Sequence, residues 1–154
     1  MADHTFKTSL RWTGNLGTGT SSYRDYSRDH ELGGPQKSAL IPGSSAKTFR
    51  GSESRYNPEE LLIAALSACH MLSYLHLCAD AGIVVTGYDD EAEGAMRLNA
   101  DGSGEFVSVI LHPRVELADP SRADEAEKLH ERAHELCFIA RSVNFPVTCE
   151  TARV

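Results

Sequence analysis

The chain has 154 residues, 41% hydrophobic and 24% charged, which is the size and composition of a single globular domain spanning residues 1–154. Its net charge of −7 argues against nucleic acid and anionic lipid as partners, because binding phosphate groups relies on clustered basic side chains. No basic segment followed by an apolar stretch follows Met1, so we expect a cytoplasmic protein.

The first third of the chain shows weak strand patterns. Alternation of apolar and polar residues predicts a half-buried strand over Thr5–Trp12, and the glycines that follow predict a turn. Thr20–Ser27 is a second candidate strand. Between Asp29 and Ser54 the pattern is poor, and we expect loops around one short strand near Lys37–Ile41.

A long helix is the clearest element. Asn57 is a favourable N-cap, Pro58 suits the first helical position, and Glu60 completes a capping box. Leu61–Ala79 contains no Asp, Glu, Lys or Arg, and Ala81-Gly82 predicts the C-terminal end. The segment approaches the length of a membrane span. Its interior Ser, His and Cys residues and the absence of flanking basic clusters favour a helix buried at the centre of a soluble protein, with no membrane partner.

The second half combines strands with one amphipathic helix. We expect strands over 83–98, 105–117 and 146–154, a hairpin turn over 99–102, and a helix from Asp119 to about Ala140. This order of elements predicts an α+β fold, in which an antiparallel sheet packs against a long central buried helix.

Four cysteines are candidates for chemistry. In a reducing compartment such thiols are more often catalytic, metal-binding or simply buried than disulfide-bonded. Cys69 lies in the middle of the long helix, and Cys137 lies on the apolar side of the second helix. One of them could be oxidised to a sulfenic acid and the other condense with it, although core packing explains both positions equally well. Cys78 faces away from Cys69, and Cys149 lies on the last strand, so we expect structural roles for both.

A zinc-hydrolase motif also occurs. His130-Glu131-x-x-His134 matches the two-histidine signature on a predicted helix. A catalytic zinc needs a third protein ligand, and no histidine follows His134. We interpret the match as coincidental, and we expect neither a metal nor an organic cofactor.

The long helix carries a family resemblance. Asn57-Pro58-Glu59-Glu60-Leu61-Leu62, then an Ala-rich stretch and Ser67-Ala68-Cys69, resembles the OsmC/Ohr family (osmotically inducible protein C and organic hydroperoxide resistance proteins). Ala133-His134-Glu135-Leu136-Cys137 and Trp12-Thr13-Gly14 support it. The resemblance implies an OsmC-like two-layer fold in an intertwined homodimer. It also implies that Cys69 reacts with peroxide, Cys137 resolves the product, and Glu59 anchors an activating arginine.

The chain departs from the family pattern in two places. Phe138 follows Cys137 where the family often has proline, and the loop after the first strand lacks the family's arginine. Arg24 lies nearest to that position and is the first candidate, with Arg28 and Arg55 as alternatives.

Helix geometry bears on the expected homodimer. Glu59 and Cys69 are ten residues apart, so they lie about 15 Å from each other along one helix and cannot share a site within it. Two antiparallel helices, one from each subunit, would bring Glu59 of one chain near Cys69 of the other.

The resemblance implies a thiol peroxidase. Organic hydroperoxides, or hydrogen peroxide, would be reduced to alcohol or water through a Cys69 sulfenic acid and a Cys69–Cys137 disulfide. An external dithiol, such as a lipoylated protein, would reduce that disulfide. One alternative is an OsmC-like protein that binds a small molecule without peroxidase activity, which the missing loop arginine favours. The other is a zinc hydrolase that uses His130 and His134.

Overall fold

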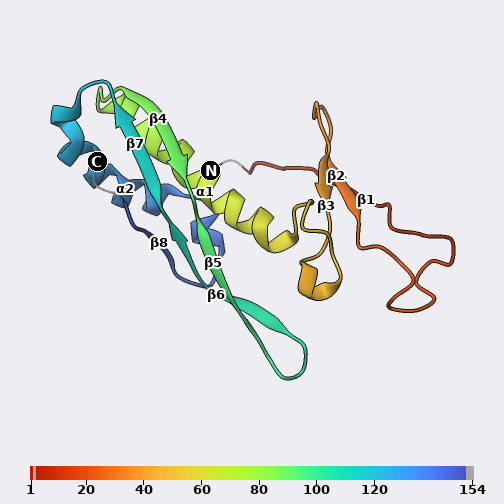
Figure 1. The fold of residues 1–154 in the computed structure, drawn as a ribbon. Helices are drawn as coiled ribbons and strands as arrows, with labels where there is room; N and C mark the ends of the chain where they lie inside the picture. Colours follow the sequence, from red (N-terminus) through yellow and green to blue (C-terminus); the bar gives the residue numbers. More distant parts are fainter. Residues whose placement is uncertain (2, 152–154) are drawn as a thin grey trace. The chain divides into compact units, whose positions relative to one another are not determined.

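The computed structural model describes residue 1 and residues 3–151, and the chain forms two compact units, Met1–Leu61 and Leu62–Val154 (Figure 1). Both helices and strands are present, which confirms the expected α+β class. The strands form three small sheets, one in the first unit and two in the second.

The first unit contains a three-stranded antiparallel sheet in the order β1-β2-β3. Its strands are β1 (Ser9–Trp12), β2 (His30–Gly33) and β3 (Ile41–Gly43), followed by the short 3-10 helix η1 (Lys47–Phe49). The strand expected over Thr5–Trp12 is present but begins at Ser9. The strand expected near Lys37–Ile41 instead begins at Ile41.

The strand predicted over Thr20–Ser27 is wrong, since this segment is an irregular loop. Arg28 explains the difference. Its guanidinium lies over the rings of Tyr23 and Tyr26, at 4.3 and 4.0 Å from their centres. It also donates hydrogen bonds to both tyrosine carbonyls at 2.6 Å, so these carbonyls are turned toward the arginine and are not available for a strand ladder.

Helix α1 (Pro58–Asp80) confirms the predicted long helix. At its start, the Asn57 side chain accepts from the Glu60 N–H at 2.8 Å, and the Glu60 carboxylate accepts from the Asn57 N–H at 3.1 Å. At its end, Gly82 adopts a left-handed conformation (φ +67°). The N–H groups of Gly82 and Ile83 then bond to helix carbonyls at 3.1 and 2.8 Å, which terminates the helix.

The second unit contains a long antiparallel pair of strand arms, each interrupted once. The first arm is β4 (Val85–Asp90) and β5 (Glu93–Leu98), and the second is β6 (Gly104–Leu111) and β7 (Pro113–Leu117). β4 pairs with β7 and β5 with β6, around the predicted hairpin turn. The strands predicted over 83–98 and 105–117 are therefore each broken once, at 91–92 and at His112. Asp90 bridges the break, because its Oδ1 accepts from the His112 N–H at 2.7 Å.

The last strand and the second helix are both shorter than predicted. β8 (Val147–Cys149) pairs parallel with β6, an exception to the expected antiparallel pairing, and residues 152–154 of the predicted strand lie outside the described residues. α2 (Ala123–Leu136) follows the 3-10 turn η2 (Pro120–Arg122). It ends before Ala140, because Cys137 leaves the helical backbone region (φ −68°, ψ 108°), and a further 3-10 turn, η3 (Ala140–Ser142), follows.

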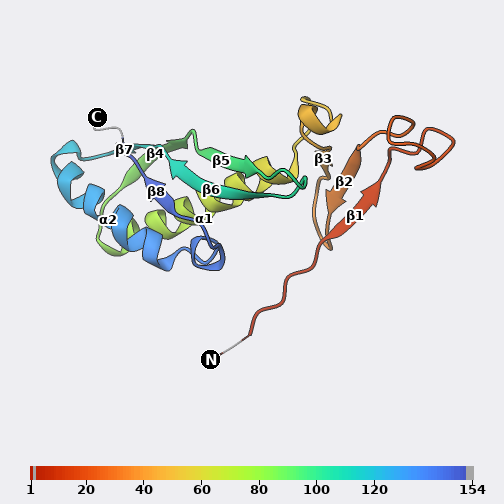
Figure 2. The same ribbon diagram turned by 90° about the horizontal axis from the view of Figure 1, so that it is seen from below.

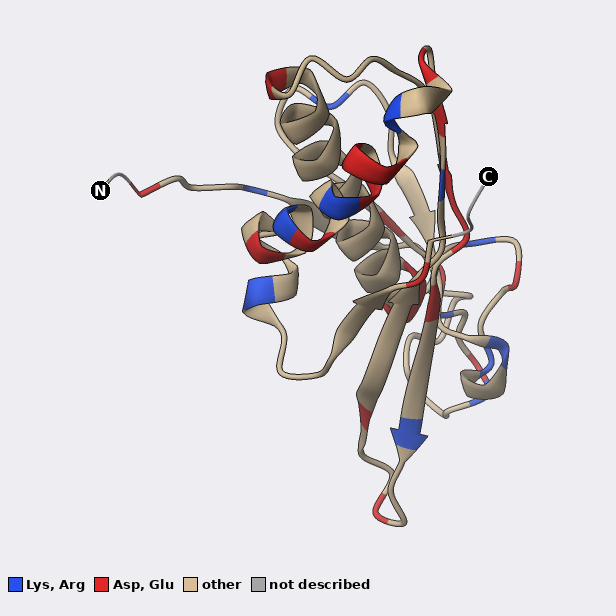
Figure 3. Cartoon of the chain, turned by 90° about the vertical axis from the view of Figure 1, so that its left-hand side faces the viewer, with Lys and Arg blue, Asp and Glu red and all other residues tan. Residues whose placement is uncertain are grey.

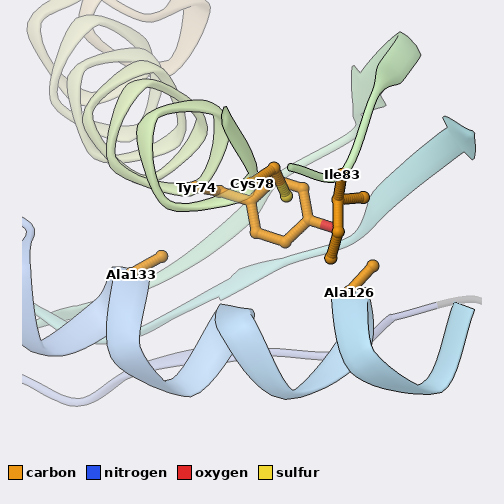
Figure 4. Close-up of a cluster of buried hydrophobic side chains, with 5 residues drawn as sticks. All are labelled: Tyr74, Cys78, Ile83, Ala126 and Ala133. Atoms are coloured by element: carbon orange, nitrogen blue, oxygen red, sulfur yellow. The ribbon is translucent and has the colours of Figure 1, made fainter. Parts of the chain in front are cut away.

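Within the second unit, α1 and α2 lie on the same side of the strands, which gives two layers (Figure 2). The core between them has two clusters. One joins α1, α2 and the β4–β7 pair, and Figure 4 shows its buried members Tyr74, Cys78, Ile83, Ala126 and Ala133. The other joins α1 to β6 and β8 through Leu66, Val109, Leu111 and Val147.

One face of α1 is buried within the chain. Leu66, His70, Tyr74 and Cys78 recur every four residues and form one buried stripe, as helix geometry requires. Leu72, on the opposite face, is 63% exposed. Burial on all sides is therefore not achieved by this chain alone. By length and composition, α1 is long and apolar enough to cross a membrane, and core helices of soluble proteins can have the same length and composition.

The stripe yields a stability prediction. Leu66 is 0% exposed, so Leu66→Ala should lower the free energy of unfolding by about 2–5 kcal/mol, through lost burial and the cavity that remains. Leu98→Ala, at an exposed position of β5, should change it by less than about 1 kcal/mol. Urea unfolding of both variants measures this. Equal losses would show that the stripe is not the packed core.

Candidate functional site

The second unit brings Cys69 and Cys137 together. Cys69 extends from the middle of α1, and Cys137 caps the C-terminus of α2. The two side chains are close enough for the Cys69 thiol to affect the pKa of Cys137, and both thiols are free. Cys69 is half-buried, whereas Cys137 is only 1% exposed. A small solute can therefore reach Cys69 more easily than Cys137.

The surroundings of Cys137 favour its neutral thiol. Burial raises the pKa of Cys137 to about 11, and the adjacent Cys69 thiol adds to this increase. The N–H of Ala140 donates to the Cys137 sulfur at 3.4 Å and acts in the opposite direction. At neutral pH Cys137 is thus protonated. Such a thiol is a poor first nucleophile toward peroxide, because the thiolate is the reactive form.

The charged residues expected at the site lie in the first unit and at the start of α1. Glu59 has one buried carboxylate oxygen, Oε2, without a hydrogen-bond partner among the described residues. Burying a carboxylate oxygen without a donor costs more free energy than a typical hydrogen bond contributes to stability. Residues 1 and 3–151 therefore leave a position at Glu59 that a cationic donor would satisfy.

The three candidate arginines differ in their contacts. Arg24 is exposed, and its guanidinium has no hydrogen bond or ion pair within the described part of the chain. Arg28 is held by tyrosine carbonyls, as described above. Arg55 forms an ion pair with Asp29 at 3.4 Å and donates to the His30 carbonyl at 3.3 Å. Of the three, Arg24 is the one whose charged group is available for another partner.

A second cluster, which the sequence did not predict, lies in the second unit, as do Cys69 and Cys137. His70 Nε2 is 3.0 Å from His130 Nδ1 and 3.8 Å from the Cys149 sulfur. His70 and His130 are 1% and 6% exposed. The three elements α1, α2 and β8 each contribute one residue. We call this the His70–His130–Cys149 cluster.

The zinc-hydrolase motif does not assemble as its sequence suggests. His130 is turned into the core against His70, while His134 and Glu131 are exposed. The group of potential metal ligands found among the described residues contains His130 but not His134. The motif identified one member of the cluster, but only the folded chain shows that His70 and Cys149 are its neighbours.

Burial determines the protonation of the cluster. It lowers the pKa of both His70 and His130 to about 4, so both imidazoles are neutral near pH 7. Burial, reinforced by nearby Asp90 and Glu127, raises the pKa of Cys149 to about 12. Asp90 is held in place by the His112 N–H and by the Ser67 hydroxyl, which both donate to it.

A pocket of about 560 Å³ opens beside this cluster. His130 and Tyr74 form part of its wall, and their rings stack at 4.0 Å with an interplanar angle of 9°. Its lining is apolar in part, with Val115, Leu117 and Ala126, and it also includes the acidic Glu116, Asp124 and Glu127 beside the basic Lys128.

Charged residues elsewhere are interspersed. Figure 3 shows acidic and basic positions scattered along the ribbon, without a long continuous basic segment in the described part of the chain. This arrangement agrees with the expectation that nucleic acid is not a partner, which stays a prediction.

Comparison with known proteins defines the class. The family model described as OsmC-like protein matches residues 51–152, more than half of the chain. An OsmC-like protein of unknown function from Vibrio cholerae has 31% identity and a TM-score of 0.82, with 99% of this chain and 100% of the other covered. The chain therefore belongs to the OsmC-like family, and its fold is the OsmC/Ohr fold.

Two further relatives are more distant. The uncharacterized protein YmaD of Bacillus subtilis is 27% identical over 147 residues, which cover 93% of this chain and 89% of YmaD. An organic hydroperoxide resistance protein from Legionella pneumophila has 17% identity and a TM-score of 0.72, with 99% and 100% of the two chains covered. At this level of identity, the similarity to the Legionella protein is a similarity of fold.

The buried histidines yield a pH prediction. Their pKa is about 4 in the folded chain against 6.5 ordinarily, so the unfolded chain binds more protons between these values. Stability is full above pH 6.5 and should fall as the pH drops toward 4, by up to about 1.4 kcal/mol per pH unit for each histidine.

Urea unfolding between pH 7 and pH 5, in buffer with a chelator, measures this slope. His130→Gln should make the dependence shallower, and the exposed-site variant His76→Gln should leave it unchanged. Identical slopes in the three proteins would contradict the assignment of the titration to the buried pair.

Proposed function

We propose that this protein is a cysteine-based hydroperoxide reductase in which Cys69 reacts with the peroxide and Cys137 resolves the product. The proximity of the half-buried Cys69 thiol to the buried, protonated Cys137 thiol is the observation that supports this most strongly. Membership of the OsmC-like family, with fold relatives named as organic hydroperoxide resistance proteins, also supports it.

The first step is nucleophilic substitution at oxygen. The Cys69 thiolate attacks the distal oxygen of the hydroperoxide, the O–O bond breaks, and the leaving alkoxide takes up a proton to become an alcohol. Cys69 is oxidised to a sulfenic acid. The partly exposed apolar residues near it on α1, including Leu62 and Met71, favour an organic hydroperoxide over hydrogen peroxide.

The second step uses the neighbouring thiol. Cys137 attacks the sulfur of the Cys69 sulfenic acid, a disulfide forms, and the hydroxyl leaves as water with the thiol proton of Cys137. A protonated, protected Cys137 suits this order, because it reacts only after Cys69 has been oxidised beside it. An external dithiol, for which a lipoylated protein is our candidate, then reduces the disulfide by exchange in the cytoplasm.

We further propose that the working form is an intertwined homodimer. The uncovered face of α1, with Leu72 63% exposed, offers an apolar surface to a second copy. The unpartnered Glu59 carboxylate oxygen supports a second contact, in which an arginine, with Arg24 first, pairs with Glu59 near Cys69 of the partner subunit. That arginine would stabilise the Cys69 thiolate.

Peroxide turnover tests the assignment. With cumene hydroperoxide and dihydrolipoamide, Cys69→Ser should abolish turnover, because it removes the nucleophile. Cys137→Ser should retain one rapid oxidation but slow turnover at least tenfold, since the sulfenic acid then lacks its resolving thiol. Cys78→Ala, which alters a buried thiol in the core cluster around Tyr74 and Ile83, should change turnover little.

Stopped-flow peroxide consumption measures both phases. Unchanged turnover in Cys69→Ser would contradict the proposal. A wild-type protein that consumes no peroxide would favour the alternative of an OsmC-like small-molecule-binding protein.

The dimer makes a separate prediction. Leu72→Asp places a charge on the proposed interface and should shift the protein toward monomer, whereas Leu98→Asp, at another exposed apolar position, should not. Light scattering at micromolar concentration measures the mass. A monomeric wild-type protein would refute the dimer, whatever the variants do.

A further inference from the structure

The His70–His130–Cys149 cluster has the geometry of a metal-ligand set. Its three ligand atoms all lie within 4.8 Å of one another. Tetrahedral zinc with bonds of about 2.0–2.1 Å to nitrogen and about 2.3 Å to sulfur places two nitrogens about 3.3 Å apart and nitrogen and sulfur about 3.6 Å apart. The corresponding separations from His70 Nε2 are 3.0 Å to His130 and 3.8 Å to Cys149, each within a few tenths of an ångström of these values. The third separation, between His130 and Cys149, is within 4.8 Å and would close by up to about 1 Å on binding.

The ligands are held in place before any cation binds. The imidazole rings of His70 and His130 are parallel, at an interplanar angle of 2°, and the Tyr74 ring stacks on the other side of His130. Cys149 is fixed in the β6–β8 ladder opposite Leu111. Because each ligand comes from a packed element, little conformational freedom would be lost on binding.

One nitrogen of the cluster lacks a protein partner. The buried Nδ1 of His70 has no hydrogen-bond partner among the described residues. In the pair of neutral imidazoles, one facing nitrogen carries a proton and donates it to the other. A cation between the two rings would take the place of that proton, which moves to the outer nitrogen of its ring, so that both facing nitrogens bind the ion through lone pairs.

The pocket supplies access and charge. His130 lies in its wall, whereas His70 and Cys149 do not, so a solvated ion that enters the pocket meets the cluster at His130. Glu116, Asp124 and Glu127 outnumber Lys128 in the lining, which favours accumulation of cations there. Asp90, close enough to influence the histidines and Cys149 electrostatically, adds negative charge on the buried side.

We propose that His70, His130 and Cys149 form a Zn²⁺ site, with a fourth position open to water from the pocket. Two imidazoles and one thiolate match the nitrogen and sulfur preference of zinc. On binding, the Cys149 thiol loses its proton to solvent, and the two neutral histidines bind through His70 Nε2 and His130 Nδ1. The ion would link α1, α2 and β8 within the second unit. The site uses neither thiol of the proposed redox pair.

Metal titration of the full chain tests this site. Cys69→Ser/Cys137→Ser serves as the parent protein, so that the thiol pair cannot bind the ion. After treatment with a chelator, Co²⁺ should bind one per chain and produce a near-ultraviolet thiolate-to-cobalt charge-transfer band. Zn²⁺ should remove that band by displacement and raise the temperature of thermal unfolding.

Variants of the parent locate the ligands. Adding Cys149→Ser should abolish the band and weaken Zn²⁺ binding at least tenfold. Adding His130→Gln should also weaken Zn²⁺ binding at least tenfold. Cys78→Ala and His134→Gln are the matched controls and should bind like the parent. Circular dichroism in chelator checks that each variant folds.

A parent protein that gives no thiolate band, or binds Zn²⁺ no more tightly than its Cys149→Ser variant, would overturn the proposal. Because the parent spectrum alone is decisive, a variant that fails to fold leaves the test intact. None of these readouts depends on peroxidase activity.

Discussion

The structure depends on the packing of one helix stripe. Leu66, His70, Tyr74 and Cys78 recur at four-residue spacing, and this row is the part of α1 that contacts α2 and the strands. Positions next to the stripe are thereby fixed as well. Cys69 stands near Cys137 at the end of α2, and His70 beside His130 within α2, because α1 packs along α2. Both the thiol pair and the histidine cluster follow from that single contact.

The stripe combines apolar and polar residues. Placing His70 in a core is favourable only when its neighbours tolerate a neutral imidazole, and the stacked His130 and Tyr74 rings provide that environment. Asp90 connects this region to the sheet, since it binds Ser67 of α1 and the backbone at the strand break. On the opposite face of α1, Leu72 is exposed among the described residues, which is the reason that a second copy is central to the proposed mechanism.

Local signals in the sequence predicted the elements that local chemistry determines. The capping box at Asn57, the stop at Gly82 and the hairpin turn were all correct, because each depends on residues a few positions apart. Thr20–Ser27 failed because Arg28 binds the tyrosine carbonyls, a contact that strand periodicity does not encode. The resemblance named Cys69 and Cys137, but the partnership of His70 with Cys149, 79 positions away, arises from tertiary packing alone.

Identification of the oxidised cysteines tests the central claim most directly. After one equivalent of cumene hydroperoxide, the account predicts that the intact protein loses two hydrogen atoms, and that peptide mapping finds a Cys69–Cys137 disulfide with Cys78 and Cys149 still reduced. An unchanged mass, or a disulfide or sulfinic acid confined to Cys78 or Cys149, would contradict it.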